Sequence, residues 1–180
     1  MGRKLLTVAA IGLTIFLTGC AATPTGNPTD LPGAAQTFDP ALIPTTPEEG
    51  ALAVEPKVFD NGLGEYTFKV GGGPVWCTLN GDEKFAICEQ NEADATYDSL
   101  TIPDSCKLSY GYQFKLGSSK AGEINCASGL YADPYLAQTL NPGETVTVGD
   151  FTCFVTDVTA RCDNPNGHYI VLGPEVWALG

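Results

Sequence analysis

The sequence predicts an all-β domain, a compact antiparallel sandwich or small barrel with disulfide-stapled hairpins, preceded by a disordered tether. Apolar and polar residues alternate in many short runs, the period expected of half-buried strands. Turn-forming pairs such as Asn-Gly and Pro-Gly separate these runs. Seven cysteines lie in a chain of 180 residues. We expect three parts: residues 1–19, 20–56 and 57–180.

Residues 1–19 have the pattern of a secretory signal peptide. Arg3 and Lys4 precede an uncharged, mostly apolar run from Leu5 to Phe16, and small residues follow. The run is shorter than the roughly 20 residues that cross a bilayer. We therefore expect this segment to direct export and then to be removed.

Leu17-Thr18-Gly19-Cys20 resembles the lipobox of bacterial lipoproteins. The resemblance implies cleavage before Cys20 and attachment of diacylglycerol to its thiol, with acyl chains such as palmitate. Two or three chains on one residue anchor stably, because each buried methylene contributes about 0.8 kcal/mol and one chain holds only reversibly. We expect a protein of the cell envelope, bound to the cell membrane and facing outward. An ordinary signal peptide and an uncleaved anchor are the alternatives.

Residues 20–56 form the expected linker behind the lipidated Cys20. Residues 21–56 contain seven of the 13 prolines, six threonines, one aromatic residue and no lysine or arginine. Such a segment buries too little apolar surface to offset the entropy lost on ordering. A disordered tether of this length spans roughly 35 to 110 Å, which would hold the domain clear of the membrane.

The charge of the chain excludes some partners. Without residues 1–19, seven basic residues remain against 21 acidic ones, a net charge near −14. Nucleic acid is not an expected partner, because phosphate neutralisation needs clusters of lysine and arginine. Adhesion to anionic headgroups needs polybasic patches as well, so we expect the lipid on Cys20 to make the membrane contact.

Residues 57–180 are expected to form one domain, since they contain 15 of the 17 aromatic residues. Segment 131–140 is the only part with the pattern of a helical turn or two. Alternating runs predict strands at 65–70, 74–79, 84–89, 110–116, 144–148, 151–156, 168–172 and 175–179.

Setting Cys20 aside leaves an even number of cysteines in an exported chain, which is typical of a disulfide framework. Six cysteines allow 15 connectivities. A zinc site is not expected, because there is no C-x-x-C pair and His168 is the only histidine. The candidates for pairing are Cys77, Cys88, Cys106, Cys126, Cys153 and Cys162.

Two segments share one pattern, strand, turn and strand with a cysteine in each arm and an acid–amide pair after the second. In the first, a four-residue loop at 81–84 would place Cys77 opposite Cys88. In the second, a two-residue turn at 157–158 would place Cys153 opposite Cys162. Directly opposed strand positions approach the Cβ separation of a disulfide. Elimination then pairs Cys106 with Cys126.

The C-terminal stretch also resembles a family. Gly143 to Cys153, then Cys162-Asp-Asn and Gly167-His168, are similar to the ends of small exported actinobacterial proteins of unknown function. This chain departs from them in Tyr169-Ile170, where they have Gly-Phe after the histidine. The resemblance covers residues 65–179 and implies an envelope location and a compact disulfide-bonded domain. It carries no catalytic residues to transfer.

Few residues are candidates for catalysis or for binding a metal, and we expect no catalytic, cofactor or metal site. Any Ser-His or Cys-His constellation must use His168, which we interpret as a turn residue because no G-x-S-x-G motif accompanies it. Segment 163–167 faintly resembles a calcium loop, but Pro165 occupies a ligand position, so we expect a hairpin turn. The acid-rich segment 89–98 is expected to be a solvated loop, and 71–73 a turn or bulge.

Four aromatic residues at strand positions could form a sugar- or lipid-binding face, although core packing is the expected role: Trp76, Trp177, Tyr110 and Tyr112. The leading functional hypothesis is a non-enzymatic envelope lipoprotein that binds a protein, glycan or lipid, or has a structural role. The alternative is a secreted carboxylate-dependent hydrolase such as a glycosidase, which needs two acids converging in a pocket.

Overall fold

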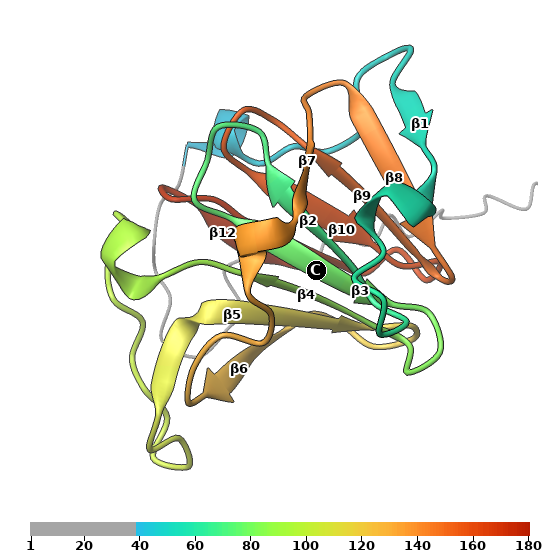
Figure 1. The fold of residues 1–180 in the computed structure, drawn as a ribbon. Coiled ribbons are helices and arrows are strands. Elements are labelled where there is room, and N and C mark those ends of the chain that lie inside the picture. The colour runs from blue at the N-terminus through green and yellow to red at the C-terminus, as the bar shows by residue number, and fades with distance from the viewer. Residues whose placement is uncertain (1–38) are drawn as a thin grey trace, which may run out of the picture.

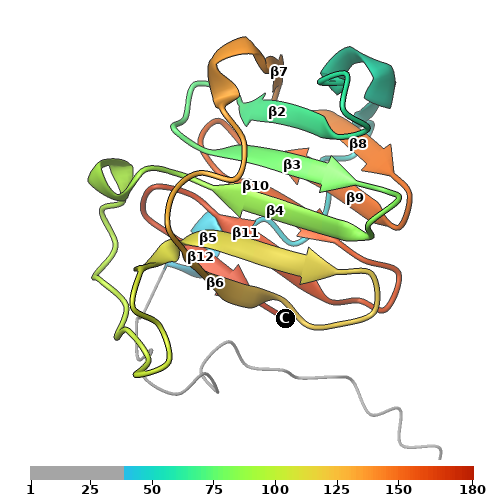
Figure 2. The same ribbon diagram turned by 60° about the horizontal axis from the view of Figure 1, so that its bottom comes forward.

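A computed structural model describes residues 39–180. These residues form an all-β sandwich of two six-stranded sheets packed face to face (Figures 1 and 2), which confirms the predicted fold class. The expected signal peptide, Cys20 and the first part of the expected tether lie outside the described residues. Within 39–180 no helix has the length and apolar character needed to cross a bilayer.

The strands fall into two sheets, named A and B. Sheet A runs in the order β1 (Leu52–Val54), β8 (Glu144–Val148), β9 (Phe151–Val155), β10 (Ala160–Asp163), β11 (Tyr169–Leu172) and β12 (Trp177–Leu179). Sheet B runs in the order β6 (Glu123–Ala127), β5 (Ser109–Gly117), β4 (Phe85–Glu89), β3 (Trp76–Asn80), β2 (Tyr66–Val70) and β7 (Gln138–Leu140). One short 3₁₀ helix, η2 (Pro40–Leu42), precedes β1, and three others lie between strands: η3 (Pro56–Phe59), η4 (Glu92–Asp94) and η5 (Pro134–Leu136).

The structure differs from the sequence prediction at the sheet edges. β1, β6 and β7 were not predicted, and both sheets are mixed, because β1 pairs with β8 and β7 with β2 in parallel. β1 also lies inside the range expected as tether, so ordered structure begins before residue 57. Helix η5 supplies the helical turn expected in 131–140, but β7 follows it. These edge strands have three to five residues and depend on pairing with a neighbour rather than on a local pattern.

Both sheets have one topology. Each is a five-stranded meander, β2 to β6 in sheet B and β8 to β12 in sheet A, flanked by a three-residue parallel strand. That parallel strand comes from the other half of the chain: β7 flanks the first meander and β1 flanks the second. The two similar cysteine segments of the sequence, β3–β4 and β9–β10, therefore occupy the same position in the two sheets.

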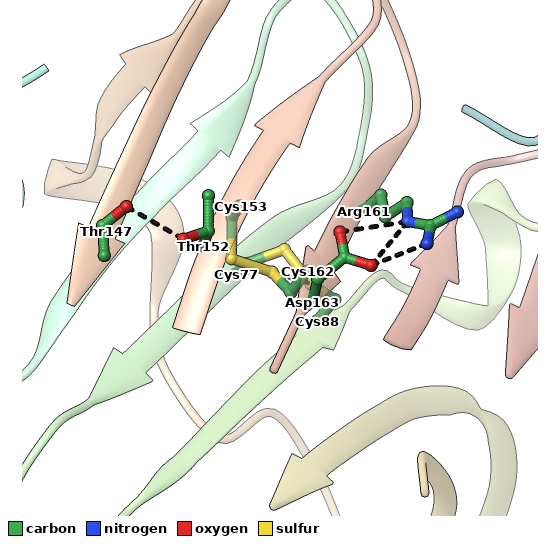
Figure 3. Close-up of a disulfide and its surroundings, with 8 residues drawn as sticks. All are labelled: Cys77, Cys88, Thr147, Thr152, Cys153, Arg161, Cys162 and Asp163. Carbon is green, nitrogen blue, oxygen red and sulfur yellow. Dashed lines mark hydrogen bonds and ion pairs between the residues drawn. A yellow bond between two sulfur atoms is a disulfide. The ribbon is translucent and has the colours of Figure 1, made fainter. Parts of the chain in front are cut away.

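The disulfides connect strands as the predicted registers require. Cys77 faces Cys88 and Cys153 faces Cys162, with a Cα–Cα distance of 4.1 Å in both pairs. These two bridges are buried and meet between the sheets, where the Sγ atoms of Cys88 and Cys162 lie 3.7 Å apart (Figure 3). The third bridge joins Cys106, in the β4–β5 connection, to Cys126 in β6.

Residues 71–73 form a turn that packs against the β9–β10 hairpin. A Cβ atom on Gly71 would lie 2.7 Å from the carbonyl oxygen of Asp157, and one on Gly73 would lie 2.8 Å from Cα of Val158. The Gly72 N–H donates to the Asp157 carbonyl at 3.1 Å. The glycines therefore permit the close approach of two backbones, as expected for a structural turn.

Connecting segments cover the outer faces of both sheets. Residues 128–137, called the crossing segment below, pass over sheet B from β6 to β7 (Figure 2). Residues 39–51 contact the outer face of sheet A before β1, and Arg161 Nη1 donates to the carbonyl of Pro44 at 2.9 Å. Consequently Trp76 and Phe154, which face away from the central core, are also buried.

Candidate functional site

A cavity of about 580 Å³ opens at the edge of sheet B. One wall is η3 with the loop that follows it, the floor includes the start of β2, and the other wall is the crossing segment with the first residue of β7. This volume lies within the range of about 300–1,000 Å³ that is typical of small-ligand sites. The cavity thus brings together segments that are far apart in the sequence.

Exposed apolar side chains are concentrated at this cavity. Of the 11 large hydrophobic residues that are exposed in the described part of the chain, five line it: Val58, Leu63, Tyr131, Tyr135 and Leu136. Tyr135 is 83% exposed and Leu136 is 84% exposed. Leaving apolar side chains in water forgoes the stabilisation of burial, so such a concentration is typical of an interaction site.

Three carboxylates line the cavity, and no lysine or arginine of residues 39–180 does. Asp60 accepts the Gly62 N–H at 2.8 Å, and Lys57 Nζ lies 3.5 Å from its other oxygen. These interactions, the backbone hydrogen bond first, hold the pKa of Asp60 below its usual value. Asp133 caps η5 by accepting the Tyr135 N–H at 2.9 Å. Glu65 is the third.

Glu65 and Tyr131 join the two walls. The Tyr131 hydroxyl donates to Oε1 of Glu65, and Asn61 Nδ2 donates to Oε2 at 3.2 Å. Partial burial, and then the hydrogen bond to Glu65, raise the pKa of Tyr131 above its usual value, so the phenol remains a donor at neutral pH. The Tyr131 ring packs edge-on against Phe85, with a centroid distance of 5.4 Å.

The buried carboxylate of Glu89, in β4, positions the crossing segment. Glu89 is 1% exposed. Its Oε1 accepts Trp76 Nε1–H at 2.8 Å and the Ala132 N–H at 2.9 Å. Its Oε2 accepts Gln113 Nε2–H at 2.9 Å and the Tyr131 N–H at 2.8 Å. Since all four partners are donors, the carboxylate fixes the backbone at Tyr131 and, with it, one cavity wall.

The burial of Glu89 shows that the prediction of a solvated loop over 89–98 was wrong at this residue. Residues such as Glu92 in that range are exposed, but Glu89 is covered by the crossing segment. Sequence reasoning missed this because the backbone donors of Tyr131 and Ala132 come from a segment more than 40 positions away.

The corresponding corner of the other half is nearly closed. There, the segment leading into β1 packs against β8 and β9 and leaves a cavity of only about 30 Å³, lined by residues such as Pro44, Glu48 and Phe154. Because the two halves share one topology, the fold itself does not require an opening at this position. The larger cavity beside β2 is walled by η3 and the loop that follows it, whereas only residues 141–143 separate β7 from β8 in the other half.

None of the four aromatic residues singled out in the sequence lines the cavity. Trp76 and Trp177 are buried, and Trp177 packs against Phe114 at 5.8 Å. Tyr110 and Tyr112 are partly buried in β5. The cavity is lined instead by two tyrosines of the crossing segment, Tyr131 and Tyr135. In the sequence, the feature that could have indicated them is the presence of two tyrosines beside proline and leucine in 131–136.

The 163–167 segment forms a hairpin turn in which side-chain oxygens of Asp163 and Asn164 are engaged within the protein. Asn164 Oδ1 accepts the N–H groups of Asn166 and His168, and its Nδ2 donates to the Gly117 carbonyl at 2.8 Å. The Asp163 carboxylate pairs with Arg161 at 2.6 Å (Figure 3). His168 is a half-buried residue of this turn, in agreement with its interpretation from the sequence.

A metal at the cysteines would need free thiolates. The Sγ atoms of Cys77, Cys88 and Cys162 lie within 4.8 Å of one another, but each belongs to a disulfide. Their proximity is therefore explained by the stacking of two bridges between the sheets.

Comparison with protein-family models, with curated proteins and with solved structures gives no match to this chain. The cavity is therefore the feature of this protein that bears most directly on its function. Its exposed aromatic and aliphatic side chains offer apolar contact, while its carboxylates and amides offer hydrogen bonds that orient a ligand, a combination that is typical of binding sites.

Proposed function

We propose that the protein is a lipid-anchored component of the cell envelope whose β domain is a non-catalytic binding module. The ligand enters the cavity between η3 and the crossing segment. The observation that carries the proposal is the difference between the two halves: one corner is open to about 580 Å³ and edged by exposed apolar side chains, while its counterpart is nearly closed.

Binding explains the carboxylates better than hydrolysis does. A glycosidase pairs a carboxylic acid that donates a proton with a second, ionised carboxylate. In this cavity Asp60, Glu65 and Asp133 each accept a hydrogen bond from within the chain. Glu65 and Asp133 are thereby used to fix the Tyr131 ring and η5, which shape the walls.

An NMR titration of residues 20–180 carrying Cys20→Ser tests the binding proposal. A panel of soluble peptides, oligosaccharides and lipid headgroups would be added to ¹⁵N-labelled protein. Shift changes confined to 58–67 and 131–138 support the proposal, and Tyr135→Ala should weaken the binding that they report. Thr147→Ala, an exposed change on sheet A, is the control and should leave them intact. Changes that map elsewhere, or turnover of a panel compound, would refute it.

The anchor is tested separately through Cys20. Membrane retention should be lost in Cys20→Ser, since attachment depends on the acyl chains. The same fractionation of wild-type cells gives the reference. A Cys20→Ser protein that still sediments with membranes would refute lipid anchoring without affecting the proposal for the cavity.

A further inference from the structure

We propose that the cavity takes a basic peptide segment of a partner protein, with lysine or arginine side chains entering it. This inference rests on the proposed function, because it names the ligand class of the same site. Charge complementarity, the exposed aromatic rings and the apolar walls each support it.

The charge of the lining favours a cation. Asp60, Glu65 and Asp133 line the cavity, and in the described part of the chain no basic residue lines it with them. Lys57, beside Asp60, has a side chain that is 89% exposed and lies outside the lining. The chain without residues 1–19 has a net charge near −14, so its long-range field also attracts cations. An anionic ligand would meet repulsion from both sources.

The aromatic rings add a second, independent attraction. Tyr131 and Tyr135 are exposed at the rim, and a cation over the face of such a ring is stabilised by the ring quadrupole. The chain already holds one guanidinium in this way: Arg161 lies 4.0 Å from the ring centroid of Tyr169 and pairs with Asp163. The cavity offers the same combination of ring and carboxylate with no cation among its lining residues.

The apolar lining suits the stems of basic side chains. Lysine and arginine bury their methylene stems on apolar surface while the charged end reaches polar groups, and Val58, Leu63 and Leu136 provide such surface. The volume of about 580 Å³ exceeds one side chain, which favours a segment of several residues. A lipid tail would bring no positive charge to the three carboxylates that line the cavity.

Isothermal titration calorimetry of residues 20–180 carrying Cys20→Ser, with three probes, tests the ligand class. They are the capped peptides Gly-Lys-Gly-Arg-Gly and Gly-Gln-Gly-Gln-Gly, and a neutral trimer of N-acetylglucosamine. We expect binding of the basic peptide alone. Raising the salt from about 10 to about 150 mM should weaken it, because the Debye length falls from about 30 to about 8 Å.

Variants locate the binding. Glu65→Gln keeps an acceptor for Tyr131 but removes the charge, and we expect about two- to fivefold weaker binding. We expect Tyr135→Ala to weaken binding by a similar factor, because the variant lacks the aromatic ring. Glu175→Gln removes one exposed charge away from the cavity and is the matched control, with unchanged affinity expected.

Each opposing outcome has a distinct meaning. Binding of the neutral trimer at 58–67 and 131–138, without binding of the basic peptide, would refute the ligand class and leave the proposed binding module intact. Equal weakening by Glu175→Gln and Glu65→Gln would show nonspecific attraction and also refute it. If no probe binds while the NMR panel yields a ligand at the cavity, this inference alone fails.

Discussion

Glu89 combines a buried carboxylate with four hydrogen-bond donors, so Glu89→Gln should destabilise the domain despite its small change in size. An amide keeps one acceptor oxygen and turns the other position into a donor, which would oppose two of the four N–H groups. A hydrogen bond to a charged group contributes about 1.5–3 kcal/mol. With partial relaxation, we expect the free energy of unfolding to fall by about 3 kcal/mol.

Thermal unfolding with the disulfides intact measures this loss, and a Tm lower by about 10 °C is expected for a domain of this size. Hydrogen exchange should also accelerate at the amides of Tyr131 and Ala132, which donate to Glu89. Glu123→Gln, at an exposed position of β6, is the control. A Glu89→Gln protein that melts within about 2 °C of wild type, with unchanged exchange, would refute the assigned role.

Further predictions concern the third disulfide, the β10–β11 turn and alkaline pH. Cys126 is exposed, so thiol trapping under mild reduction should find the Cys106–Cys126 bridge opened before the two buried bridges. Asn164→Ala loses the side-chain bonds of the turn and should lower stability by about 1–3 kcal/mol in urea unfolding. Burial chiefly raises the pKa of Tyr97 and of Tyr131. Above about pH 10 the unfolded chain ionises first and stability falls, and phenylalanine at either position should flatten that fall.

Local features of the sequence were sufficient for the hairpins. Alternation with period 2 and turns of four and two residues placed Cys77 opposite Cys88 and Cys153 opposite Cys162, and the observed registers agree. These features are predictable because neighbouring strands joined by a short turn have few ways to pair. The parallel edge strands β1 and β7 could not be predicted in this way, because each pairs with a strand from the other half of the chain.

The cavity illustrates what sequence reasoning missed. Its tyrosines lie in a segment whose local pattern indicated only a helical turn, and one of them, Tyr131, donates to Glu65, which comes directly before β2. Glu89 belongs to an acid-rich run that is typical of a solvated loop. Only the crossing segment, lying over sheet B, supplies the backbone donors that make its burial favourable.

The sequence by itself determined the strand-rich character of the domain, the two cysteine hairpins and the acidic balance, since these depend on composition and near neighbours. The tertiary structure decided how the two meanders stack, which edge strand each receives and where side chains remain exposed. Those outcomes depend on contacts between segments that are distant in the sequence. Such contacts compete with many other possible pairings, and no local pattern distinguishes among them. The candidate site belongs to this second group, because its two walls meet only when the crossing segment packs against β4.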